Sequence, residues 1–159
     1  MCGDCEIVES WIDPREVAKL EADLLKIEPR FMDVTHSFNG GLYTRSAKVK
    51  RGEILIGAKH RAKNYFSITS GKFAIWDAEN GLRVLSAPFS EICRDGTQRL
   101  GIALEDSTCQ NVFETEKTNW EEVEKEMIYP FTLPTSCAGI MLRLVKAVLG
   151  QHGTIQLKF

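Results

Sequence analysis

Eight short segments rich in β-branched, aromatic and other strand-forming residues follow one another between residues 42 and 114, with glycine, proline, aspartate or asparagine between them. Short runs at such close spacing are typical of β-sandwiches and β-barrels. A set of eight strands matches a jelly roll, which is built from two Greek keys. The centre of the chain is therefore predicted to be all-β. The predicted strands cover residues 42–50, 53–58, 65–69, 72–77, 82–86, 89–93, 98–105 and 108–114.

Two glycine-containing turns refine this prediction. Asn80 followed by Gly81 predicts a two-residue hairpin, because a type I′ turn needs positive φ at both central residues. Ser70 and Gly71 are predicted to close the preceding hairpin in the same way.

Helices are predicted before and after the strands. Two of them begin with a capping box, in which an N-cap side chain and a glutamate three residues later satisfy free backbone N–H groups. The two boxes are Asp13 with Glu16 and Thr118 with Glu121. Helices are predicted at residues 14–27, 119–128 and 134–149, and a final strand at residues 153–159.

A chain of 159 residues suits one domain with a sizeable core. Its expected parts are an N-terminal helical segment (1–38), a barrel (39–115) and a C-terminal helical extension (116–159). The sequence contains neither an apolar run of the roughly 20 residues that span a bilayer nor a secretion signal at its start. We expect a cytoplasmic protein without membrane contact.

The five cysteines are an odd number and are widely spread, unlike the disulfide framework of a small secreted domain. Cys2 and Cys5 have the spacing of zinc ligands, but no second close pair completes a tetrahedral site. Free thiols are therefore predicted.

The segment GEILIGAKHRAKNYFSITSG at residues 52–71 resembles the first conserved motif of the cupin superfamily. In that motif a glycine precedes His-x-His by five residues, and a glutamate and a second glycine follow. Gly52, His60 and Gly71 fall in register with it. A wider stretch, residues 39–127, resembles small cupin-like proteins of tailed phages. The resemblance implies a jelly-roll barrel that holds a divalent metal through imidazole and carboxylate ligands and that commonly forms dimers.

The implied metal ligands are not present at the matching positions. Ala58 stands in place of the first histidine, Asn64 in place of the glutamate, and Arg99 in place of the third histidine. One imidazole and a neutral amide are too few ligands for Fe, Mn or Zn, and a guanidinium stays protonated. No metal and no other cofactor are therefore predicted.

Arg99 would place a fixed positive charge where the family keeps a cation, which favours an anionic ligand. Residues 43–63 agree, because they contain seven basic side chains and one acidic one. The predicted ligand is a nucleotide, a sugar phosphate or a carboxylate. The predicted ligand-binding residues are His60, Arg99, Arg45, Asn64 and Tyr65.

These charges also have a purely structural interpretation. The basic residues around Arg45 can be the solvated face of an edge strand, with the acidic helix docked on it through weak ion pairs. His60 can be a satisfied structural residue, since no catalytic partner is evident. A net charge of −2 and few interleaved aromatics do not favour nucleic acid as a partner.

Residues 134–149 carry more apolar side chains than a helix with one wet face needs, so a second copy of the chain is expected to cover them. Three functions remain open. The chain is a non-enzymatic, phage-type accessory protein that binds a small anion or a protein partner without metal. Alternatively, it is a metal-dependent isomerase or oxygenase, or a virion component in which the barrel is scaffold.

Overall fold

The computed structural model describes residues 34–130 and 156–158, together with residues 15, 19 and 139. The predictions for Cys2 and Cys5, the helices at 14–27 and 134–149 and the oligomer contact drawn from the latter lie outside these residues. Ten strands and helix α2 are described. They are β1 (Val34–Asn39), β2 (Leu42–Val49), β3 (Glu53–Ile56), β4 (Asn64–Ser70), β5 (Lys72–Asp77), β6 (Gly81–Ser86), β7 (Phe89–Cys93), β8 (Arg99–Ala103), β9 (Ser107–Glu114), α2 (Trp120–Met127) and β10 (Gln156–Lys158).

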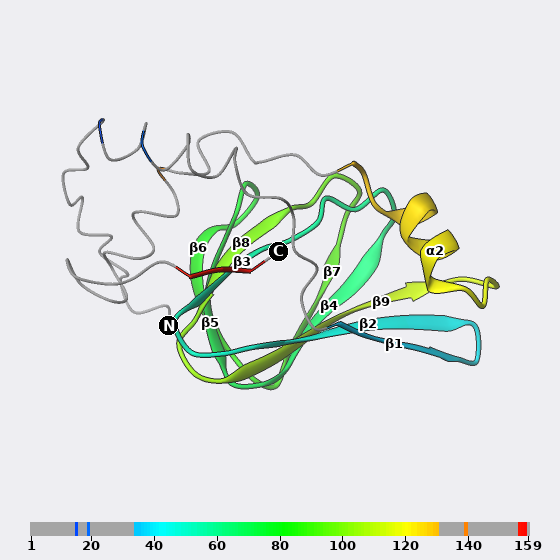
Figure 1. Cartoon of the computed structure of the whole chain (residues 1–159), viewed down its shortest axis with the longest axis horizontal. Helices are drawn as coiled ribbons and strands as arrows, with labels where there is room; N and C mark the ends of the chain where they lie inside the picture. Colours follow the sequence, from blue (N-terminus) through cyan, green and yellow to red (C-terminus); the bar gives the residue numbers. More distant parts are fainter. Residues whose placement is uncertain (1–14, 16–18, 20–33, 131–138, 140–155, 159) are drawn as a thin grey trace.

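The strands form two five-stranded sheets that face each other (Figure 1). One sheet has the order β1-β2-β9-β4-β7 and the other the order β10-β3-β8-β5-β6. All described pairs are antiparallel except that of β10 with β3. Apart from the hairpins β1–β2 and β5–β6, successive strands alternate between the sheets, as in a jelly roll. The predicted jelly roll is confirmed, and each of the eight predicted strands is present within a few residues of its expected bounds.

The first strand was not predicted. β1 begins at Val34, before the expected start of the barrel at residue 39, and it pairs along its whole length with β2. His36, which lies between the predicted N-terminal helix and the first predicted strand, is part of β1. The side chains of β1 alternate between half-buried and exposed, and few of them are strongly apolar. Because β1 covers one side of β2 and β9 covers the other, β2 is not the edge strand that the sequence suggested.

The inner face of the first sheet changes character along the barrel. Paired side chains alternate between the two faces of a strand, so every second pair points inward. From the α2 end, the inward pairs of β2 and β9 are Tyr43 with Phe113, Arg45 with Asn111, Ala47 with Cys109 and Val49 with Ser107. An aromatic level is thus followed by a polar level and then by an apolar one. Of these eight residues, Ala47, Val49 and Cys109 belong to the main core.

Both predicted turns differ in detail. β4 and β5 lie in different sheets, so Gly71 turns the chain from one sheet to the other and does not close a hairpin. It has a φ of +83°, and a Cβ there would collide with Ser107, so only glycine fits. Asp77 pairs with Gly81, which leaves a three-residue loop between β5 and β6 where a two-residue turn was predicted. The Asp77 carboxylate accepts the backbone N–H of Asn80 at 2.8 Å and thereby fixes this longer loop.

Helix α2 closes one end of the barrel (Figure 1). Its N-cap is Asn119, whose side-chain oxygen accepts the backbone N–H of Glu121 at 2.8 Å, and not Thr118 as predicted. Val123 is fully buried and packs with Tyr43 and Phe113. Among the described residues, no helix is both long and apolar enough to cross a membrane.

Candidate functional site

A cavity of about 520 Å³ opens inside the barrel at the end that carries α2. Its walls come from strands of both sheets, from the segment around His60 and from α2. The volume lies within the range of small-molecule sites, which is roughly 300 to 1,000 Å³. Three of the predicted ligand-binding residues, Arg45, His60 and Arg99, line this one cavity although they are far apart in the sequence.

His60 lies on the cavity wall and is only 4% exposed. Its ring meets Phe113 edge-on, with the centroids 5.3 Å apart. Within the described part of the chain, neither ring nitrogen has a hydrogen-bond partner. Burial, and after it the positive charges of Arg45 and Arg99, lower the pKa of His60 to about 4. At neutral pH the imidazole is therefore uncharged, with one N–H donor and one acceptor to offer to a ligand.

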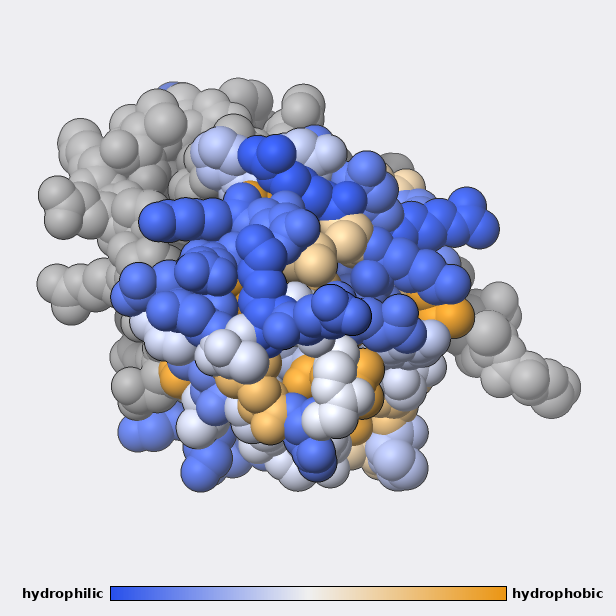
Figure 2. Space-filling view, turned by 90° about the vertical axis from the view of Figure 1, so that its right-hand side faces the viewer, coloured by the Kyte–Doolittle hydropathy of each residue, from blue (hydrophilic) through white to orange (hydrophobic). Residues whose placement is uncertain are grey.

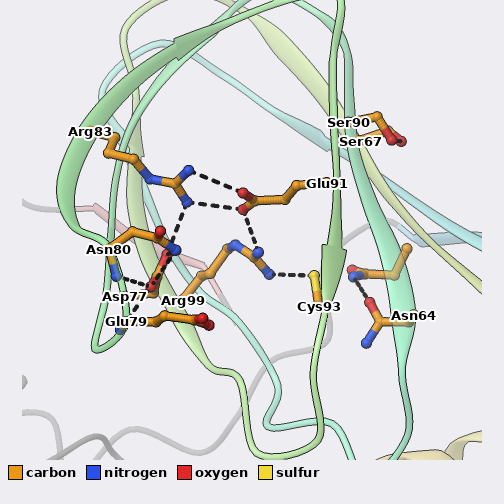
Figure 3. Close-up of polar contacts among 11 residues, drawn as sticks. Asn64, Ser67, Asp77, Glu79, Asn80, Arg83, Ser90, Glu91, Cys93 and Arg99 are labelled. Carbon is orange, nitrogen blue, oxygen red and sulfur yellow. Dashed lines mark hydrogen bonds and ion pairs between the residues drawn. The ribbon is translucent and has the colours of Figure 1, made fainter. Parts of the chain in front are cut away.

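Arg99 enters the cavity from β8 and is held by two polar side chains of β7 (Figure 3). One guanidinium nitrogen donates to Glu91 Oε1 at 2.6 Å, and the other donates to Cys93 Sγ at 2.9 Å. The guanidinium carbon lies 4.4 Å from the centre of the Phe66 ring, a cation–π contact. In the described residues its Nε has no hydrogen-bond partner. Arg99 is thus fixed in position and keeps one N–H free.

Glu91 joins Arg99 to a longer ionic network across the two sheets (Figure 3). It accepts two hydrogen bonds from Arg83 of β6, at 2.9 and 3.0 Å, and Arg83 also donates to Asp77 at 3.1 Å. Burial opposes ionisation of Glu91, but the hydrogen bonds from the two arginines outweigh it and hold its pKa below the usual value. Because β7 and β6 end their respective sheets, this network ties together two edge strands.

Arg45 is paired with the helix. Its Nε lies 3.0 Å from Glu124 Oε1, and both side chains are more than four-fifths buried. The acidic helix therefore docks on Arg45 through an ion pair, as the structural interpretation expected, although the pair faces inward. Lys48 and Lys50 of the same basic stretch are exposed.

The charge of the cavity wall is predominantly positive. Among the residues that the structure describes, its charged side chains are Arg45, Arg61, Arg99, Lys125 and one carboxylate, Glu124. Arg61 and Lys125 are exposed, so they stand toward the solvent side of the cavity. Figure 2 shows that this end of the molecule is mainly hydrophilic.

Two other predicted residues do not line the cavity. Asn64 is buried, and its side-chain oxygen accepts the Nδ2–H of Asn111 at 2.8 Å. Asn64 thus acts through Asn111, which does line the cavity. Tyr65 is 43% exposed, because it alternates with its inward neighbours Asn64 and Phe66 and faces outward from β4.

Sequence reasoning did not find several residues of the site. Asn111, Glu91 and Lys125 were not predicted, because each is brought in by strand pairing or helix docking over a long sequence separation. The alternation of β9 contained a usable signal: polar Asn111 stands between apolar Cys109 and Phe113 on the inward face.

The donor set near His60 contains few metal ligands. In the part of the chain that the structure describes, no group of three or more histidine, cysteine, aspartate or glutamate side chains could hold a metal ion. Around the imidazole stand two guanidinium groups, which lower its pKa.

No protein family matches the chain, and no curated protein is similar to it. Solved structures similar to it include ectoine synthase from P. lautus, which is 13% identical and covers 68% of this chain and 81% of its own, with a TM-score of 0.49. A cupin-2 domain protein from Shewanella frigidimarina is 11% identical, covering 59% of this chain and 91% of its own at a TM-score of 0.43. An RmlC-like cupin with a double-stranded β-helix fold, from Methanocaldococcus jannaschii, is 8% identical, covering 57% and 87% at a TM-score of 0.43. At sequence identities this low, the similarity concerns the fold alone.

Proposed function

We propose that this protein is a non-enzymatic binding protein of cupin type that takes up a small anionic ligand inside its barrel without a metal ion. The observation that carries this proposal is the wall of the cavity. Among the described residues, four cationic side chains and one carboxylate line it, and both ring nitrogens of His60 and Nε of Arg99 have no hydrogen-bond partner. Buried polar groups normally have hydrogen-bond partners, so these nitrogens call for one within the cavity.

The charge balance supports an anion even when the internal ion pairs are counted. Arg45 is offset by Glu124, while Arg99 and Arg83 are offset by Glu91 and Asp77. Two lining cations, Arg61 and Lys125, have no such offset within the cavity wall. Both stand toward the solvent side of the cavity, where this surplus favours the approach of a negative charge.

The donor chemistry argues against the metal that cupins usually hold. In the described part of the cavity wall His60 is the one imidazole, and Asn64 already uses its oxygen to accept from Asn111. Arg99 carries a permanent charge that repels a divalent ion. These residues do not fit a metal ion.

His60 supports binding better than acid–base catalysis. An efficient general base has a pKa near the working pH, whereas the pKa of His60 is about 4. We assign no catalytic residue. On the resemblance to small phage cupin-like proteins, we extend the proposal to an accessory role in a phage-encoded setting.

A thermal-shift screen of the metal-free protein tests this function. The probes are a nucleoside monophosphate, glucose 6-phosphate, inorganic phosphate and benzoate, and a ligand that binds only the folded state raises Tm. We expect at least one anion to stabilise the wild type and to have less effect on Arg99→Gln. Arg51→Gln is the matched control, because it removes an exposed arginine outside the cavity.

Two results would overturn the proposal. One is that no anion stabilises the protein, or that Arg99→Gln responds like the wild type. The other is near-stoichiometric Fe, Mn, Ni or Zn in protein purified without added metal, if that metal disappears in His60→Ala.

A further inference from the structure

We propose that the occupant of the cavity is a monocarboxylate with a compact apolar body, and that it lies with its body on the cavity floor and its carboxylate at the level of Arg99 and His60. This inference rests on the proposed function and names the ligand class for the same site. Three observations carry it: an apolar floor, small residues that leave room there, and a nearly balanced charge at the polar level.

The floor of the cavity is a surface of the main hydrophobic core. The residues that line the cavity and also belong to this core are at most 8% exposed. They are Ala47, Leu55, Phe66, Ile75 and Cys109. Ala47 and Cys109 form the next level below Arg45 and Asn111, because each lies two residues further from the α2 end of its strand. A ligand that reaches past the polar level therefore meets only apolar side chains from these two strands.

Small residues make the floor hollow. Gly101 of β8 pairs with Leu55 on one side and Ile75 on the other, and all three line the cavity. A Cβ on Gly101 would lie only 3.3 Å from a side-chain carbon of Ile75. The opposite wall carries Ala47 and Cys109, which are also small. The space between the two sheets is thus kept open at the apolar level and not only at the polar one.

An apolar floor selects against polyhydroxylated ligands. A sugar hydroxyl placed there would lose its hydrogen bonds to water and find no replacement. Such a site discriminates strongly between apolar and hydroxylated ligands, because a polar group buried without a hydrogen-bond partner costs binding free energy. A hydrocarbon or aromatic body gains from the same contact. The floor therefore favours an apolar acid over a sugar phosphate or a nucleotide.

The polar level favours a single negative charge. Arg45 and Arg99 are each within 3.0 Å of a protein carboxylate, so neither is available as a fully uncompensated cation. The groups that remain free to form hydrogen bonds are Nε of Arg99 and the ring nitrogens of His60. A carboxylate supplies acceptor oxygens for donors of both kinds, the Nε–H of Arg99 and the N–H of a neutral imidazole. A phosphate dianion brings more charge and more acceptors than these groups can satisfy.

A titration of the metal-free, full-length protein with matched probes tests the ligand class. Benzoate and cyclohexanecarboxylate have both the carboxylate and the apolar body. Acetate has the carboxylate without that body, and benzamide has the apolar body without the charge. Inorganic phosphate and glucose 6-phosphate complete the set. We expect the two apolar acids to bind at least tenfold more tightly than acetate, benzamide or either phosphate.

A variant that fills the cavity floor separates the contribution of the apolar body from that of the carboxylate. Cys109→Leu should weaken benzoate binding at least tenfold and leave acetate binding unchanged, whereas Cys109→Ala keeps the space and should bind benzoate like the wild type. Ala47→Leu fills the floor from the neighbouring strand and replaces Cys109→Leu if that variant fails to unfold cooperatively. Equal benzoate affinity in a folded filled variant and the wild type would overturn the inference.

The remaining outcomes distinguish this inference from the proposed function. If a phosphate or a sugar phosphate binds and the apolar acids do not, the ligand class is wrong and anion binding stands. If benzamide binds as tightly as benzoate, the charge is not recognised and both fail. If no probe binds, both fail as well.

Discussion

The buried imidazole of His60 should make the stability of the folded protein depend on pH. In the unfolded chain His60 has an ordinary pKa near 6.5, and in the folded protein its pKa is about 4. Between these two values the unfolded state binds a proton that the folded state does not, so unfolding is favoured as pH falls. The stability contribution is intact above pH 6.5 and is lost progressively toward pH 4.

The magnitude follows from the same two pKa values. One pH unit of difference is worth ~1.4 kcal/mol, so His60 can cost the fold up to about 3 kcal/mol once pH falls through the whole window. By pH 4.5 roughly 2.5 kcal/mol of this should be lost relative to pH 7. For a domain with a total stability of about 5 to 15 kcal/mol, such a loss is easily measured.

Urea unfolding of the wild type and His60→Gln at several pH values between 7 and 4.5 is the assay. Glutamine does not titrate, so the difference in unfolding free energy between the two proteins should change by roughly 2.5 kcal/mol in favour of the variant as pH falls. Carboxylates such as Asp77 and Glu91 titrate in both proteins and cancel in this difference. His36→Gln is the control, and because His36 is less buried than His60, its pH effect should be smaller. Parallel stability curves for the wild type and His60→Gln would refute the reasoning.

Three further predictions concern the frame of the site, each measured as a free energy of unfolding by urea. Glu91→Gln leaves two arginines without their shared carboxylate and should cost about 2 kcal/mol, with the loss persisting at high salt; no loss would show that the network does not tie the edge strands. Gly71→Ala should cost about 3 kcal/mol because its Cβ has no room, whereas Gly81→Ala, with open space but a φ of +67°, should cost about 1 kcal/mol; equal costs would contradict the steric argument. Asn119→Ala should cost about 1 kcal/mol and Thr118→Ala almost nothing, and the reverse order would restore Thr118 as the cap.

The strands of the barrel could be predicted because their signal is local. Alternating or continuous apolar runs between turn residues are visible without knowledge of the partner strand, and two of them, β5 and β7, have the expected bounds. β1 escaped prediction because it has few strongly apolar residues, and its half-buried side chains are covered by tertiary contacts such as that of His36 with Trp120. The loop before Gly81 is longer than predicted because the Asp77 carboxylate binds two backbone N–H groups within it.

Part of the site could be predicted from motif spacing and from local charge. His60 and Arg99 were found through the spacing of a cupin motif and Arg45 through the basic stretch around it, and all three line the cavity. Tyr65 was proposed from its chemistry alone, but strand alternation turns it outward. The carboxylates that pair with the cavity arginines, Glu91 and Glu124, come from β7 and α2. Their pairing depends on tertiary contacts that no local pattern encodes.

Calorimetric titration of benzoate into chelator-treated protein, with its metal content checked by elemental analysis, tests metal-free anion binding in the barrel most directly. The account predicts binding at one site per chain in the absence of metal, weakened at least tenfold in Arg99→Gln and unchanged in Arg51→Gln. Benzoate binding that needs added Fe, Mn or Zn, or that is equal in the wild type and Arg99→Gln, would contradict it.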